Sequence, residues 1–147
     1  MRLIVVTGLS GSGKSVALNM LEDLDYYCID NMPLAVLEHF VRETVATGDP
    51  VYERMAVGID ARSRPEEIRD FHDCLERLQQ TGVDTEVLFL QADNDIILKR
   101  YSETRRKHPL TSEATPLADA IQHERELLAP IAEQADLAID TSRTTMY

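Results

Sequence analysis

A glycine-rich stretch near the start of the chain has the residue types and spacing of a phosphate-binding loop. It matches the Walker A pattern G-x-x-x-x-G-K-[ST] with Gly8, Leu9, Ser10, Gly11, Ser12, Gly13, Lys14 and Ser15. Glycines allow a tight turn whose backbone N–H groups point at phosphate oxygens, and the start of a helix adds partial positive charge there. Lys14 would reach the β- and γ-phosphates, and the Ser15 hydroxyl would ligate Mg²⁺. The stretch therefore predicts a nucleoside triphosphate site; the alternative is a strand-to-helix turn that binds nothing.

An acidic residue at a strand end is the second requirement, because it would hold Mg²⁺ or a water bound to it. Three expected strands end in one: Asp30, Asp60 and Asp140. In nucleotide-kinase-like sheets the third strand lies beside the strand that precedes the phosphate loop, so we expect Asp60 nearest the metal. The stretch Asp60, Ala61, Arg62 and Ser63 would also bring a guanidinium and a hydroxyl to the edge where ligands sit in open α/β folds. Alternatively, Asp60 is a solvated strand end and Ser63 a helix cap.

Asp30 and Asn31 end the second expected strand. In kinases of small molecules this position often faces the phosphoryl acceptor. The alternative is that the two residues only cap the helix that follows.

A basic segment, residues 99–109, holds five of the fifteen Lys and Arg residues. Arg105 and Arg106 precede Pro109, where a lid could begin. We expect these two arginines to reach over the nucleotide and stabilise charge on the transferring phosphate. With Lys14 and Asp60 they are the candidate catalytic residues. The alternative is a solvated helix face.

Five short apolar runs alternate with segments of helical period, which is typical of strands covered by helices on both faces. The expected strands are Leu3–Thr7, Tyr26–Asp30, Met55–Asp60, Glu86–Leu90 and Leu137–Asp140. One expected helix begins near Pro65 and ends before Gly82, and the last is bent or divided by Pro130. Such alternation requires a parallel sheet with right-handed crossovers. We predict an α/β fold, namely a P-loop NTPase three-layer sandwich with a mainly parallel, nucleotide-kinase-like sheet.

The length of 147 residues predicts one P-loop nucleotide-binding domain over residues 1–147. The net charge of −11 argues against binding nucleic acid or an anionic membrane through the general surface, and no apolar run is long enough to span a bilayer. Two cysteines without an export signal predict reduced thiols and a cytoplasmic location. The sequence stops seven residues after Asp140, where this fold normally adds a covering helix, so we expect the N-terminal part of a longer protein.

Several segments together resemble one bacterial family, the RapZ/YvcJ nucleotide-binding proteins: GLSGSGKSVALNMLEDLDYYCIDNMP, DARS, LFLQAD, RYSETRRKHPL and LAIDTS. The resemblance covers essentially the whole chain, although members are longer and only their N-terminal domain is matched. It implies ATP binding at Gly8–Ser15, GTP binding at Asp60–Ser63, slow hydrolysis of both nucleotides and a regulatory, RNase-adapter role. RNA and sugar-phosphate recognition belongs to the family's C-terminal domain, so neither is expected of this chain.

We therefore favour a weak ATPase/GTPase, a hydrolase whose ligands are ATP, GTP and Mg²⁺ and in which Ser15 and Asp60 hold the metal. A small-molecule kinase that transfers the γ-phosphate to an unidentified acceptor is the alternative, and acceptor-dependent ADP production would separate the two. A binding module without turnover is a third reading. The sequence has no N-K-x-D or T-K-x-D stretch to select guanine, so the preference between ATP and GTP stays open. A homo-oligomer is possible, and the sequence does not decide the oligomeric state.

Overall fold

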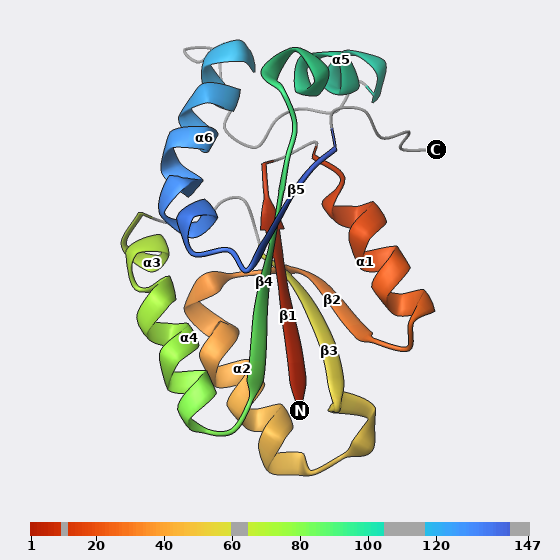
Figure 1. Cartoon of the computed structure of the whole chain (residues 1–147), viewed down its shortest axis with the longest axis vertical. Helices are drawn as coiled ribbons and strands as arrows, with labels where there is room; N and C mark the ends of the chain where they lie inside the picture. Colours follow the sequence, from red (N-terminus) through yellow and green to blue (C-terminus); the bar gives the residue numbers. More distant parts are fainter. Residues whose placement is uncertain (10–11, 60–64, 105–116, 142–147) are drawn as a thin grey trace.

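The computed structural model describes residues 1–9, 12–59, 65–104 and 117–141. Within these ranges five strands form one sheet in the order β2-β3-β1-β4-β5 (Figure 1). Their bounds are β1 Arg2–Gly8, β2 Tyr27–Met32, β3 Arg54–Ile59, β4 Asp84–Gln91 and β5 Leu137–Asp140. Every pairing between these strands is parallel, so their carboxyl ends share one edge of the sheet. The predicted parallel α/β architecture is confirmed.

Helices cover both faces of the sheet. Their bounds are α1 Lys14–Asp23, α2 Leu34–Thr47, α3 Pro65–Arg69, α4 Phe71–Gln80, α5 Asn94–Thr104 and α6 Leu117–Glu133, with a 3-10 turn at Pro50–Tyr52. Figure 1 shows α2, α3, α4 and α6 on one face and α1 on the other, while α5 lies beyond the carboxyl ends of the strands. The three layers predicted from the sequence are present.

The core has two parts because alternate residues of each strand point to opposite faces. Leu3 and Val5 of β1 belong to the larger cluster, together with residues of α2, α4 and α6. Ile4 and Val6 belong to a smaller cluster with Leu18 of α1. Both faces of β1 are therefore buried, which explains why its sequence is a continuous apolar run.

Two helix predictions differ from the structure. The helix expected from Pro65 to before Gly82 is divided at Asp70, a single residue between α3 and α4 whose ψ of −4° departs from the helical value. Of the two expectations for the last helix, bent or divided by Pro130, division is wrong, because the helix continues through Pro130 to Glu133. Pro130 removes one N–H group, yet both it and Glu126, four residues earlier, are exposed, so water can satisfy the carbonyl that lost its partner.

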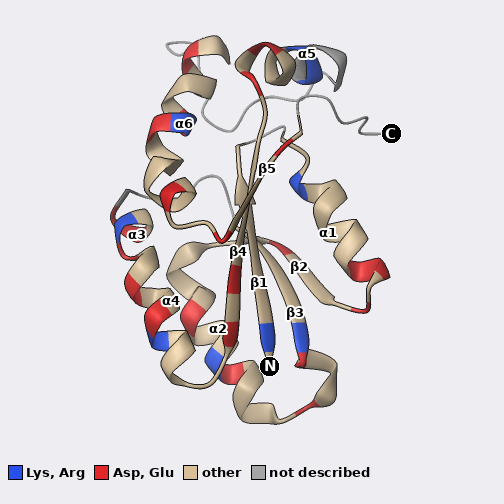
Figure 2. Ribbon diagram, in the orientation of Figure 1, with Lys and Arg blue, Asp and Glu red and all other residues tan. Residues whose placement is uncertain are grey.

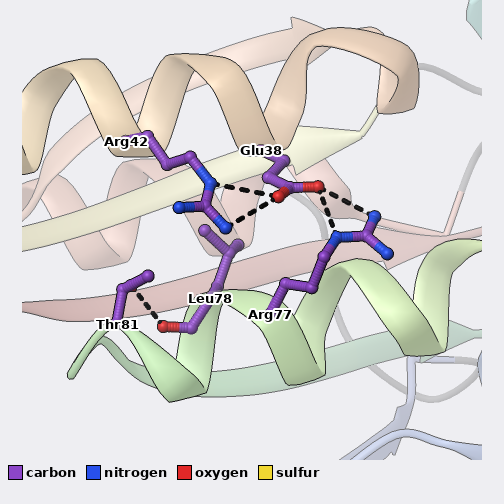
Figure 3. A network of polar contacts seen from close by, with 5 residues as sticks. All are labelled: Glu38, Arg42, Arg77, Leu78 and Thr81. Carbon is purple, nitrogen blue, oxygen red and sulfur yellow. Dashed lines mark hydrogen bonds and ion pairs between the residues drawn. The ribbon is translucent and has the colours of Figure 1, made fainter.

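An ionic network joins α2 to α4 on the helix-rich face (Figure 3). Glu38 accepts hydrogen bonds from Arg77 Nε at 2.9 Å and from Arg42 Nε at 3.0 Å, and it also pairs with both Nη2 groups. The Arg77 hydrogen bond holds the pKa of the Glu38 carboxyl below its ordinary value. These partly exposed contacts add to the packing between α2 and α4, and each contributes only a little to stability.

Acidic residues lie on helices of both faces of the sheet (Figure 2). Burial raises the pKa of the Cys28 and Cys74 thiols, which keeps them protonated and agrees with a packing role.

In the part of the chain that the structure describes, no helix combines the length and the apolar character that crossing a membrane requires.

The end of β1 approaches the neighbouring strand β4 unusually closely. Gly8 has φ of 150°, and a Cβ atom built there would collide with the Leu90 backbone. The next residue continues the contact, since Leu9 N–H donates to Leu90 O at 3.1 Å. The first glycine of the Walker pattern is therefore required by strand packing as well as by the turn.

The end of β5 is tied to the loop that follows β1. Thr141 N–H donates to Gln91 O at 2.7 Å, and its buried hydroxyl donates to Ser12 O at 2.6 Å. Arg100 of α5 donates to the same hydroxyl at 3.1 Å and to Thr141 O at 2.6 Å. Thr141 thus links β5, α5 and the loop.

Gly8→Ala should lower the free energy of unfolding by about 3 kcal/mol, because the added methyl meets backbone and the φ value disfavours L residues. Gly48→Ala is the matched control: Gly48 has φ of 64° but open space around its Cβ position. We expect the control to cost only about 1 kcal/mol. Urea unfolding measures both, and equal losses would contradict the packing argument.

Thr141→Val should lower the free energy of unfolding by about 1–3 kcal/mol, because the isosteric change removes the buried hydroxyl that bonds to Ser12 O and to Arg100. Thr141→Ser keeps the hydroxyl and should cost less than about 1 kcal/mol. Thermal and urea unfolding of the pair measure the hydroxyl contribution. A serine variant as unstable as the valine variant would show that the methyl group, not the hydrogen bonds, matters.

Candidate functional site

Lys14 begins α1 at the middle of the sheet's carboxyl edge. Gly13, with φ of 100°, turns the chain into the helix, and no side chain caps the first turn. The Lys14 ammonium donates to Ile59 O at the end of β3 at 2.8 Å and lies 3.3 Å from Asp30 Oδ1. Its side chain is 19% exposed, so the cation is held in place yet still reachable from solvent.

The described part of the Walker loop is closed by its own hydrogen bonds. Ser12 is fully buried, and both its N–H, at 3.0 Å, and its hydroxyl donate to Leu9 O. Leu9 is itself buried in the larger core cluster, whereas Ser15 is exposed beside Lys14. The Ser12 side chain therefore shapes the loop, while the Ser15 hydroxyl is accessible for a metal ligand.

Asp30 and Asn31 do not cap the next helix. The residue before α2 is Pro33, and no side chain caps that helix. β2 instead continues past the predicted end at Asp30 to Met32, with a register shift against β3 between Ile29 and Met32. The capping alternative is wrong, because no side chain caps α2; Asp30 instead contacts Lys14.

Several predicted site residues lie outside the described residues: Ser10, Gly11, Asp60, Ala61, Arg62, Ser63, Arg105 and Arg106. The reasoning that selected Asp60 used the position of its strand, and this part is confirmed, since β3 lies directly beside β1. Asp140 ends β5, which β4 separates from β1. Among the described residues, no three His, Cys, Asp or Glu side chains gather into a group that could hold a metal ion.

Sequence reasoning missed three contributors to this edge. Gly58 of β3 leaves room for the Asp30 carboxylate, with which a Cβ would collide. Thr141 and Arg100 hold the loop from the β5 side. Thr141 could have been suspected as a polar residue directly after a strand ending at the same edge, whereas Gly58 carries no local signal.

The arrangement suits an anion. The first turn of a helix offers N–H groups that have no partner within the helix, together with partial positive charge. Lys14 adds a full positive charge at the same point, and the first turn of α1 contains no acidic residue. The Asp30 carboxylate beside Lys14 is the opposing charge. Phosphate or a similar anion is the ligand class that fits the N–H groups of the first turn and the Lys14 ammonium.

Curated relatives match the chain along its whole length. A nucleotide-binding protein of Thioalkalivibrio sulfidiphilus is 54% identical over 147 residues, which are 100% of this chain and 51% of the relative. A nucleotide-binding protein of Methylococcus capsulatus is 52% identical over 147 residues, again 100% of this chain and 50% of the relative. The chain therefore spans about half the length of the curated relatives it matches.

Solved structures support the fold. Shikimate kinase from Bacteroides thetaiotaomicron superposes with a TM-score of 0.59 at 19% identity, over 95% of this chain and 86% of that one. At this identity the likeness concerns the fold alone, which is the P-loop kinase fold.

The family model described as the RapZ-like N-terminal domain matches residues 1–146. With the match to the relatives, this confirms the resemblance seen in the sequence: the chain belongs to the RapZ-like N-terminal domain family.

Proposed function

We propose that residues 1–147 form a nucleotide-binding domain in which the loop Gly8–Ser15 binds the phosphates of ATP, and that GTP is bound as well. The observation that carries this proposal is the position of Lys14, whose ammonium lies at the start of α1 and at the ends of β2 and β3. The name nucleotide-binding protein, given to relatives more than half identical to the chain, supports it. Asp60–Ser63 are proposed to contribute to the nucleotide site.

We further propose slow hydrolysis of the bound triphosphate in a regulatory role. Lys14 and the loop amides hold the phosphates in line with an attacking water, and Arg105 and Arg106 stabilise charge on the transferring phosphate. The exposed Ser15 hydroxyl fits a magnesium ligand, and Asp60 is the proposed second one. Bound Mg²⁺ would supply neutralisation of the phosphate charge.

One observation favours the kinase alternative. Asp30 Oδ1 lies 3.3 Å from Lys14 Nζ. With the γ-phosphate on Lys14, the Asp30 carboxylate would lie beside it and could hold the hydroxyl of a phosphoryl acceptor. Release of ADP only in the presence of a hydroxyl-bearing acceptor would support a kinase. Release of inorganic phosphate without an acceptor would support the hydrolase.

Lys14→Ala should weaken ATP binding about tenfold to a hundredfold, because charge-assisted hydrogen bonds to phosphate are lost. The fold should persist, since the ammonium reaches the site and not the core. Arg54→Ala is the control: it also removes one positive charge, but from an exposed residue at the opposite edge of the sheet. Isothermal titration calorimetry measures both, and unchanged ATP affinity in Lys14→Ala would remove this loop from the nucleotide site.

Asp60→Asn should not weaken ATP binding in EDTA, because the change is nearly isosteric and removes a charge that does not attract metal-free phosphate. Mg²⁺-dependent tightening and phosphate release from ATP and GTP should fall by about tenfold or more, because a metal ligand is lost. Asp140→Asn is the comparison variant at another strand end. If Asp140→Asn gives this pattern and Asp60→Asn does not, the metal lies at a different strand from the one proposed.

A further inference from the structure

The cation that the proposed function assigns to phosphate is already engaged. Lys14 Nζ donates to Ile59 O at 2.8 Å and lies 3.3 Å from Asp30 Oδ1. The two side chains are 19% and 34% exposed, so the pair is partly open to solvent and does not belong to the core. Any phosphate that takes Lys14 must compete with the Asp30 carboxylate.

The backbone around Asp30 is shaped to hold the carboxylate there. The β2–β3 register shifts between Ile29 and Met32, and Asn31 adopts φ of 58°. A left-handed residue inside a strand is unfavourable for most L residues and is tolerated best by Asn and Gly. The Asn31 N–H group then donates to Asp30 Oδ1 at 2.7 Å, which fixes the orientation of the carboxylate.

The facing strand supplies the space. Gly58 of β3 lies against Asp30, and a Cβ atom at this position would collide with Asp30 Oδ1 and come within 2.9 Å of Leu18 Cδ1. A residue with any side chain would push the carboxylate out of its position. The register shift, the left-handed Asn31 and the missing side chain at residue 58 are separate features with the same result.

We propose that Asp30 lowers the affinity of the loop for phosphate in two ways, by competing for Lys14 and by repelling phosphate charge, and that the repulsion makes the site discriminate against metal-free triphosphate. This inference rests on the proposed nucleotide site. A carboxylate beside the phosphates repels metal-free ATP more strongly than the magnesium complex, which carries less negative charge. Asp30 thereby lets the metal-bound nucleotide bind preferentially.

Asp30→Asn is the decisive variant, because its amide oxygen can still accept the Asn31 N–H bond while the charge is lost. ATP binding in EDTA should tighten about threefold to tenfold, and binding with Mg²⁺ should tighten less. Calorimetry at fixed ionic strength measures both constants. Asp23→Asn is the charge-matched control, because Asp23 is exposed at the far end of α1 and should leave both constants unchanged.

The same substitution in a Lys14→Ala background tests the competition itself. If Asp30 acts by occupying Lys14, its removal should tighten binding less in the double variant than in the single one. Equal tightening in both backgrounds would overturn the competition. If Asp30→Asn lowers the melting temperature so far that binding cannot be measured, Asp30→Ser is used in its place. The serine hydroxyl oxygen can accept the same Asn31 N–H bond and carries no charge.

The outcomes separate this inference from the proposed function. ATP binding that does not depend on Lys14 would overturn the nucleotide site. ATP binding that depends on Lys14 but is unchanged or weaker in Asp30→Asn with EDTA would overturn the inference and leave the site intact. Loss of Mg²⁺-dependent tightening alone, with EDTA binding unchanged, would make Asp30 a metal ligand and also overturn it.

Discussion

Parallel pairing on both sides of β1 is the constraint on which the site depends. β3 and β4 both pair with β1, so the chain that leaves β1 emerges at the centre of the edge where every strand ends. Lys14 can meet Ile59 and Asp30 only because β3 and β2 follow in order on one side. On the other side, β5 reaches the same loop through Thr141. The contacts at this edge therefore depend on the order of the strands more than on any single motif.

The charge at the start of α1 differs in sign from the net charge of the chain. The chain carries a net charge of −11, yet the start of α1 combines a lysine with the positive end of a helix. Field strength falls quickly with distance in salt solution, so the charges nearest the ligand dominate. A nearby carboxylate such as Asp30 therefore matters more to a phosphate than many distant surface acids.

Much of the fold could be predicted because its signals are local. The buried strands are apolar runs, and the Walker pattern identified the start of α1 with Lys14 and Ser15. The path of β2 through Asn31 could not be predicted, because its left-handed conformation depends on the facing strand and on the space at Gly58. The contact between Thr141 and Ser12 joins residues 129 positions apart, which no spacing rule relates.

The link through Thr141 has a consequence for local unfolding. One hydroxyl is shared by the phosphate loop and α5, and the same residue continues the pairing of β5 with β4. Opening any one of these elements breaks bonds that support the others, so their free energies of opening are coupled. We therefore expect Ser12, next to the start of α1, to open together with Thr141 and Arg100 rather than by itself.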